Sequence, residues 1–116
     1  MIAATDIKLR RAENLLEVSF SDGSQASLPA EYLRVESPSA EVQGHSQSER
    51  QLVAGKATVG ISGVEPVGNY AVRLVFTDGH DTGIYSWDIL YRLGREQPQR
   101  WAAYVKRLDE AGLKRH

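Results

Sequence analysis

Hydrophobic and polar positions alternate along several short segments of the chain, as they do in strands that bury one face. The clearest alternation is in LLEVSF (15–20) and YAVRLVF (70–76), and the second segment is also rich in β-branched and aromatic residues. DIKLR (6–10) alternates more weakly, and TVGISGVEPV (58–67) is strand-like although it contains glycines and a proline. These four segments predict the strands of a small, mostly antiparallel sheet.

Two Asp-Gly pairs predict tight hairpin turns after the two best strands. The pair at 22–23 is followed by QASL (25–28), and the pair at 78–79 is followed by a short strand predicted near 82–84. In the RAEN segment between the first two strands, Asn14 is suited to a positive φ. The chain is therefore expected to contain consecutive antiparallel hairpins.

Helical signals follow each hairpin and end the chain. After Pro29, the segment AEYLRV can form one or two helical turns. Ser86 is a suitable N-cap for WDILYRLG, and Gly94 is a suitable residue to end that helix. A last helix is predicted over 97–112. Its apolar face is formed by residues at helical spacing, namely Trp101, Val105, Leu108 and Ala111.

The two hairpin regions are similar to each other. LEVSFSDGSQASLPAEYLR (16–34) and VRLVFTDGHDTGIYSWDILYR (72–92) both read as strand, Asp-Gly turn, short strand and short helix. This similarity predicts an α+β fold: a small, mostly antiparallel sheet built from two ββα-like units, plus a C-terminal amphipathic helix. His80 follows the second turn where Ser24 follows the first. The turn itself therefore does not require a histidine.

A polar segment rich in Ser and Gly, residues 36–57, separates the two units. It has neither helical nor strand periodicity, so we predict a long loop with a short strand near 40–43. Loops of this length are uncommon in compact domains and are either functional or mobile. The chain has 116 residues, which suits a single domain over 1–116.

Composition and charge exclude several classes of function. The net charge is −1 and the pI is near 6.3, so the basic footprint of a nucleic-acid-binding domain is absent. No apolar run approaches the roughly 20 residues that span a bilayer. The chain has no cysteine, which excludes disulfides, thiolate metal ligands and cysteine nucleophiles. We therefore expect a cytoplasmic protein with no nucleic-acid or membrane partner.

The candidate chemical groups are the histidines. His80 in DGHDTG and His45 in QGHSQ, together with Asp81, could bind a divalent metal, but no sequence spacing enforces such a site. The alternative is that His80 has a structural role in its turn. A Walker A motif and a G-x-S-x-G elbow are absent, and Asp81 directly follows His80, unlike the H-x-D/E pattern of iron oxygenases. We therefore expect no enzymatic activity.

An aromatic-rich segment supplies a candidate interaction surface. In GIYSWDIL, Tyr85 and Trp87 flank Ser86, and one aromatic can face the core while the other partly faces solvent. The competing interpretation is that Trp87 packs in the core. If the aromatics instead form the lip of a shallow groove, Tyr70, Arg73 and His80 are expected near it. The predicted interaction surface consists of Tyr70, Arg73, Tyr85 and Trp87.

Three phrases resemble the gamma-butyrobetaine hydroxylase-like N-terminal domain family: LPAEYLR (28–34), LRVESPSAEVQGH (33–45) and VEPVGNYAVRLVFTDGHDTGIYSWDILYRLGRE (64–96). Small bacterial members are similar to this chain in length. In other proteins the domain precedes the 2-oxoglutarate, iron(II)-dependent barrel of carnitine synthesis, or accompanies iron–sulfur P-loop proteins of the Mrp type. Because no barrel is present here, the resemblance implies a non-catalytic accessory domain that binds an unknown protein partner. The alternative is a metal-ion-binding or iron–sulfur-related module.

In the hydroxylases, the resemblance implies a structural zinc held by three cysteines and a histidine of the second unit. The cysteine positions correspond here to Ser37, Ser39 and Val42, and the histidine position corresponds to His80. Hydroxyls and a valine do not replace thiolates on zinc. We therefore expect no cofactor, and keep zinc or iron held by His80 and His45 as the alternative. The alignment also predicts that Ser37 lies beside His80.

Overall fold

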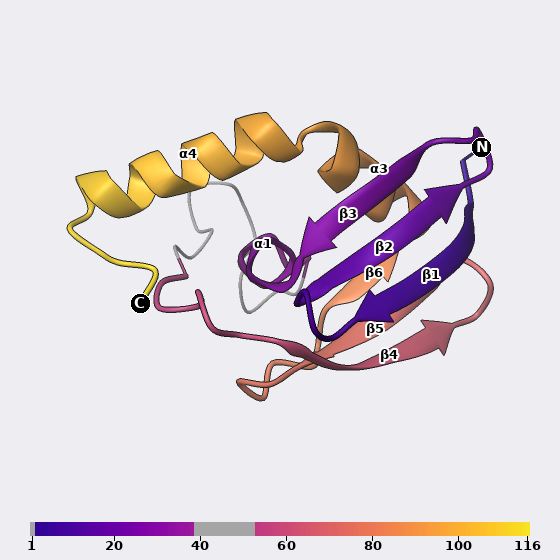
Figure 1. The fold of residues 1–116 in the computed structure, drawn as a ribbon, viewed down its shortest axis with the longest axis horizontal. Helices are drawn as coiled ribbons and strands as arrows, with labels where there is room; N and C mark the ends of the chain where they lie inside the picture. Colours follow the sequence, from indigo (N-terminus) through magenta and orange to yellow (C-terminus); the bar gives the residue numbers. More distant parts are fainter. Residues whose placement is uncertain (1, 39–52) are drawn as a thin grey trace.

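The computed structural model describes residues 2–38 and 53–116. The strands are β1 (Ala4–Arg10), β2 (Leu15–Phe20), β3 (Gln25–Pro29), β4 (Ile61–Val67), β5 (Ala71–Phe76) and β6 (Ile84–Ser86). The helices are α1 (Ala30–Val35), α3 (Trp87–Arg95) and α4 (Gln97–Glu110). This arrangement confirms the predicted α+β class (Figure 1).

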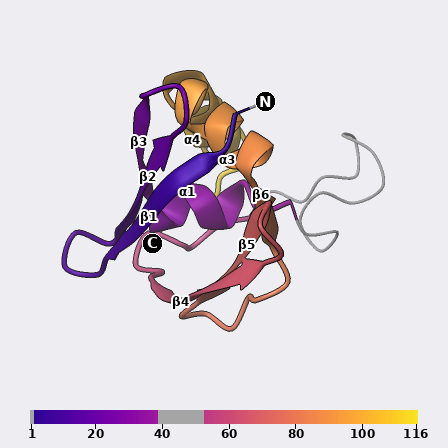
Figure 2. The same ribbon diagram turned by 90° about the vertical axis from the view of Figure 1, so that its right-hand side faces the viewer.

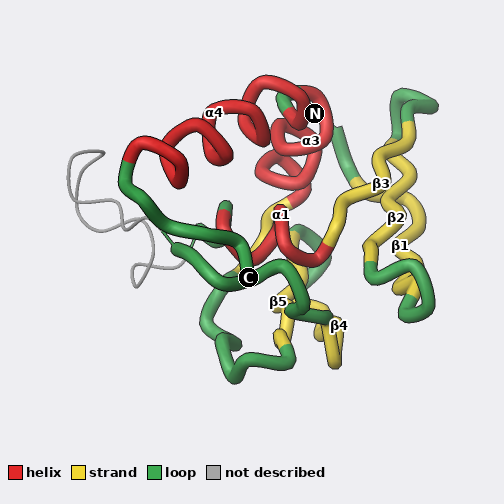
Figure 3. The backbone as a smooth tube through the Cα atoms, turned by 60° about the vertical axis from the view of Figure 1, so that its left-hand side comes forward, coloured by secondary structure: helices red, strands yellow, loops and turns green. Residues whose placement is uncertain are grey.

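The strands form two antiparallel sheets of three strands each, in the orders β1-β2-β3 and β4-β5-β6. Each sheet is built from strands that are consecutive in the chain, and each leads directly into a helix. Helix α1 lies between the two sheets, as Figures 2 and 3 both show, and α4 runs along the outside of the molecule. The two predicted units therefore form separate layers, and α1 packs between them.

The internal repeat is confirmed, and it is longer than the sequence suggested. Each unit is βββα because β1 pairs with β2 as β4 pairs with β5. The first strand of each unit has a register shift directly after a residue that pairs with a phenylalanine. In β1 this residue is Ala4, which pairs with Phe20, and in β4 it is Ile61, which pairs with Phe76. Such a β-bulge bends the strand and increases its twist. The same bend therefore recurs in both units.

The two Asp-Gly turns also have the same backbone geometry. Gly23 has a φ of 88° and Gly79 a φ of 93°, a region that glycine adopts at little cost. The carbonyls of Ser24 and His80 each accept a hydrogen bond of 2.9 Å from the phenylalanine N–H before the turn. His80 and Ser24 are therefore equivalent in the fold, and only their side chains distinguish the two turns.

The core lies between the sheets and the helices that follow them. Two buried phenols join the units in opposite directions: Tyr32 of α1 donates to the Leu93 carbonyl at 2.7 Å, and Tyr85 of β6 donates to the Leu33 carbonyl. Burial raises the pKa of both phenols, so they remain protonated donors at neutral pH. The main cluster of buried apolar residues comprises Leu16, Val18, Phe20, Leu28, Ala30, Tyr32, Leu33, Val59, Ile61, Val72, Leu74, Phe76, Tyr85, Leu90 and Leu93.

The helix boundaries confirm one predicted cap and correct another. The Ser86 hydroxyl accepts a hydrogen bond of 3.2 Å from the Ile89 N–H, as expected for an N-cap. Gly94 does not end its helix. A Cβ built at Gly94 would lie 2.8 Å from the Cβ of Ala26, so the glycine allows α3 to approach β3 closely. None of the described helices has the length and apolar character needed to cross a membrane.

Three further expectations concern the bounds of single elements. The short strand predicted near 40–43 lies outside the described residues. The last strand of the second sheet is found at Ile84–Ser86 instead of near 82–84, and α4 ends at Glu110. These shifts of a few residues leave the order of elements as predicted.

Candidate functional site

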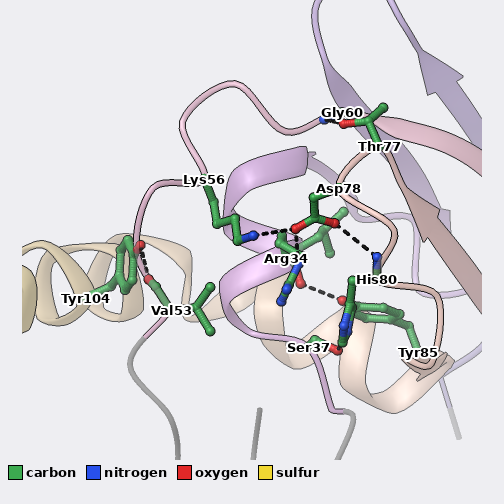
Figure 4. A network of polar contacts seen from close by, with 11 residues as sticks. Arg34, Ser37, Val53, Lys56, Gly60, Thr77, Asp78, His80, Tyr85 and Tyr104 are labelled. Atoms are coloured by element: carbon green, nitrogen blue, oxygen red, sulfur yellow. Dashed lines mark hydrogen bonds and ion pairs between the residues drawn. The ribbon is translucent and has the colours of Figure 1, made fainter. Parts of the chain in front are cut away.

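A polar network surrounds the second Asp-Gly turn, where the two units meet (Figure 4). We call Arg34, Ser37, Lys56, Asp78 and His80 the junction network. The Oδ2 atom of Asp78 accepts hydrogen bonds from Arg34 Nε at 2.8 Å and from Lys56 Nζ at 2.6 Å. Its Oδ1 atom accepts from the His80 N–H at 3.1 Å. One carboxylate therefore connects α1, the segment before β4 and the turn after β5.

Electrostatics favour the charged form of Asp78. Burial by itself raises the pKa of this carboxyl, but the bonds from Lys56, the His80 N–H and Arg34 outweigh burial and leave the pKa at about 2. Arg34 is more deeply buried, with 11% of its side chain exposed against 21% for Asp78. Its Nη1 atom is buried without a hydrogen-bond partner in the described part of the chain. Asp78 is therefore the counterion on which the buried guanidinium depends.

The predicted contact between Ser37 and His80 is confirmed. The Ser37 hydroxyl lies 2.9 Å from Nε2 of His80, and both side chains are buried. The imidazole stands beside the Phe76 ring, with 6.0 Å between the ring centroids. A Cβ built at Gly83 would lie 2.7 Å from the Ser37 Oγ, so the absence of a side chain there makes room for the contact. The loop after α1 is thus fastened to the second turn by a serine–histidine pair.

This pair occupies the place where the resemblance implies a zinc site, but its donors do not suit one. The hydroxyl of Ser37 and the imidazole of His80 bond to each other, and the sequence has no cysteine to supply thiolates. Residues 2–38 and 53–116 contain no group of three or more His, Cys, Asp or Glu that could hold an ion. Asp81 faces Arg73, with 3.5 Å between Oδ2 and Nη1. His45, Ser39 and Val42 lie outside the described residues.

We predict that protein purified without a histidine tag carries zinc and iron well below one equivalent per chain. The reason is that a serine–histidine pair lacks the charge and softness of a thiolate site. Elemental analysis of the wild-type protein and of His80→Ala and His45→Ala variants measures this. One equivalent of metal that both substitutions remove would contradict the prediction and would establish the alternative site.

The predicted interaction residues lie near one corner of the second sheet. Arg73 of β5 pairs with Glu65 on β4 and with Ile84 on β6, so the three side chains form a row on the same face. Arg73 donates to Glu65 Oε1 through Nη2 at 2.6 Å, and to the Asp81 carbonyl through Nη1 at 2.8 Å. The hydrogen bond and charge of Glu65 raise the pKa of Arg73. The guanidinium is therefore held in one orientation at the surface.

Tyr70 directly precedes β5, and Trp87, the first residue of α3, directly follows β6. The Trp87 N–H donates to the Tyr70 carbonyl at 3.0 Å, and its indole Nε1 donates to the Asn69 carbonyl at 2.9 Å. Tyr70 is 57% exposed, whereas Trp87 is half-buried and packs against the main core. We call Tyr70, Arg73, Ile84 and Trp87 the β5–β6 corner.

Tyr85 does not belong to this surface, so its predicted role is wrong. Its side chain is 0% exposed, and its hydroxyl bonds to the Leu33 carbonyl inside the core. Alternation along β6 turns Tyr85 inward and turns Ile84 outward, where Ile84 is 46% exposed. Ile84 was not predicted, because alternation places it outward only once Tyr85 is known to face inward.

Comparisons with known proteins place these features in context. Residues 7–91 match the family described as gamma-butyrobetaine hydroxylase-like, N-terminal. One similar protein of known NMR solution structure is 46% identical, with 99% of this chain and 90% of that chain covered and a TM-score of 0.86. A second NMR solution structure is 50% identical, with coverages of 99% and 86% and a TM-score of 0.85.

A crystal structure from Acidithiobacillus ferrooxidans ATCC 23270 is also similar. Its protein, of unknown function and assigned to the DUF971 family, is 41% identical, with 78% of this chain and 91% of that chain covered and a TM-score of 0.67. No curated protein matches the chain. The comparisons therefore agree on the fold and on a small domain of similar length.

Proposed function

This chain belongs to the gamma-butyrobetaine hydroxylase-like N-terminal family, and we propose that it is a non-catalytic accessory domain that binds another protein through the β5–β6 corner. The observation that carries the proposal is the exposure of Tyr70 and Ile84 together with the fixed orientation of Arg73. The proposal assigns no reaction to the chain itself. It places the partner in the cytoplasm, as the lack of cysteine favours.

Exposed apolar side chains support this choice of surface. In the described residues, the large hydrophobic side chains that are exposed are Tyr70, Ile84, Val105 and Leu113. Two of the four are in the β5–β6 corner. Tyrosine and arginine are also the residue types that most often carry binding energy when an interface excludes water from them. The corner thus combines apolar area with residue types suited to an interface.

The polar contacts of Arg73 support a protein partner in a second way. Because Glu65 and the Asp81 carbonyl already hold the guanidinium, binding loses little side-chain freedom there. The two carboxylates of Glu65 and Asp81 outnumber the one guanidinium, so the rim of the corner is net negative. We expect the partner to present an apolar centre with basic groups around it. The net charge of −1 for the chain gives no support for nucleic acid.

Co-purification with matched variants tests the proposal. We predict that Arg73→Ala and Tyr70→Ala each weaken capture of the partner from the protein's own cells by about tenfold, because each removes a central interface group. Arg10→Ala is the control. Arg10 makes a diagonal ion pair with Glu17 across β1 and β2 in the first sheet, at 3.0 Å, so it is a comparable exposed arginine away from the corner. Equal capture by all three variants would show that the corner is not the binding surface.

A further inference from the structure

A groove lies between α1, α4 and the C-terminal tail, and none of its lining residues belongs to the β5–β6 corner. Its volume is about 240 Å³. Figure 3 shows the tail running back from the end of α4 towards α1. The residues that line the groove are Pro29, Glu31, Tyr32, Gln97, Trp101 and Arg115. We call it the Arg115 groove.

The guanidinium of Arg115 is bound in this groove as a ligand would be. Its Nη2 and Nε atoms donate to the two carboxylate oxygens of Glu31 at 2.7 and 2.9 Å. Its Cζ atom lies 5.2 Å from the centroid of the Trp101 ring. A paired contact with a carboxylate and stacking on an aromatic face are the two interactions that distinguish arginine from lysine. The groove therefore has the chemistry of an arginine-binding site.

Glu31, which accepts the hydrogen bonds of the guanidinium, is more deeply buried than Arg115, which donates them. The Glu31 side chain is 7% exposed, while that of Arg115 is 43% exposed. Trp101 is held between Tyr32 and Tyr104, with centroid distances of 6.4 and 5.3 Å. The indole is thus held by the body of the domain, and the buried Glu31 carboxylate is the anion that a guanidinium meets beside it.

Backbone hydrogen bonds also hold the tail. It follows Gly112, whose φ is 69°, and its carbonyls at Lys114 and Arg115 accept bonds from the N–H groups of Gly55 and Ala57 at 2.9 and 3.0 Å. The Leu113 side chain is 42% exposed, and its N–H donates to the Leu108 carbonyl at 2.9 Å. Removal of the tail would leave the buried Glu31 carboxylate without its cation, which is costly unless another cation replaces it.

We propose that the Arg115 groove is an arginine-binding site, that Arg115 is its built-in ligand, and that an arginine on an extended segment of a partner protein replaces it. The open volume beside Arg115 gives an incoming side chain room to enter before the tail leaves. The occupant is an arginine because the bidentate bond to Glu31 and the stacking on Trp101 both need a planar guanidinium. This site is independent of the β5–β6 corner, and either can fail alone.

A peptide of the tail sequence, acetyl-AGLKRH-amide, is a suitable probe, and acetyl-AGLKAH-amide is its control. Binding is followed by the NMR shift of the Trp101 indole N–H. We expect Arg115→Ala protein to bind the first peptide with a saturable shift, and the wild type to bind it about tenfold more weakly because the tether gives Arg115 a high effective concentration. Arg107→Ala, which removes an exposed arginine of α4, should bind like the wild type.

Two further variants keep the test decisive. Adding Glu31→Gln to Arg115→Ala should weaken binding by about tenfold, because a charge-assisted pair is lost. If Arg115→Ala does not fold, Arg115→Lys serves in its place, since lysine cannot make the paired contact and should yield to the peptide more readily than arginine. Equal shifts with the two peptides, or no shift at Trp101 in a folded variant, would overturn the proposal.

Discussion

Tyr85→Ala is expected to lower the free energy of unfolding by about 4 kcal/mol, the cost typical of removing a fully buried aromatic side chain. The ring of Tyr85 fills the space between β6 and α1, and its hydroxyl satisfies the Leu33 carbonyl. The substitution therefore creates a cavity and also leaves a buried acceptor without its donor. Urea denaturation followed by circular dichroism measures the change.

Tyr70→Ala is the matched control, because Tyr70 lies in the same sheet region but is 57% exposed. Its loss should change the free energy of unfolding by less than about 0.5 kcal/mol, as is usual for surface substitutions. Tyr85→Phe should fall between the two, at about 1 kcal/mol, because it removes only the hydroxyl. Similar losses from Tyr70→Ala and Tyr85→Ala would contradict the burial of Tyr85 at the junction of the units.

Asp78→Asn should cost about 2 kcal/mol at pH 7, which is the second largest effect we expect. Asparagine keeps the acceptor for the His80 N–H but loses the charge that Arg34 and Lys56 contact. The cost is below that of a fully buried pair because Asp78 is 21% exposed and partly screened by water. Thermal or urea unfolding of wild type and variant gives the difference.

The effect of Asp78→Asn should depend on pH in a defined direction. The folded pKa of Asp78 is about 2, below the ordinary value of 3.8, so the charged form stabilises the fold. This contribution is complete above about pH 4 to 5 and is lost as the pH falls towards 2. The stability difference between wild type and Asp78→Asn should therefore be constant near neutrality and should shrink in acid.

The repeat supplies a control for this prediction. Asp22 holds the equivalent turn in the first unit, where it is exposed and accepts hydrogen bonds from the Ser24 N–H and the Tyr91 hydroxyl. Asp22→Asn therefore removes the same turn carboxylate without affecting a buried guanidinium, and should be less destabilising than Asp78→Asn. Equal effects of the two substitutions would show that the ion pairs with Arg34 and Lys56 add nothing.

Much of the fold could be predicted because its strands carry local signals. Alternation in 15–20 and 70–76, followed each time by an Asp-Gly pair, located both hairpins and their repeat. The division into two sheets was not predictable in the same way, since it depends on which strands pair across the 36–57 segment. Gly94 was wrongly predicted to end its helix. A glycine that allows close packing against Ala26 cannot be told in sequence from a glycine that ends a helix.

The candidate sites show a similar division between local and distant information. The neighbourhood of Ser37 and His80 was predicted through the family resemblance, and the structure confirms it. The partners of Asp78 were missed, because Arg34 and Lys56 are 44 and 22 residues away in the chain. The inward face of Tyr85 was also missed, since a strand of three residues is too short to reveal which of two nearby aromatics is buried.

Binding at the β5–β6 corner is tested most directly by backbone amide shift mapping of the isotopically labelled chain against the co-purified partner. We predict that the largest NMR shift changes fall at Tyr70, Arg73 and Ile84, while β1 to β3 keep their shifts. The Arg73→Ala variant should lose these changes and Arg10→Ala should retain them. Shift changes confined to β1–β3, or unchanged by Arg73→Ala, would contradict the assignment of this corner as the binding surface.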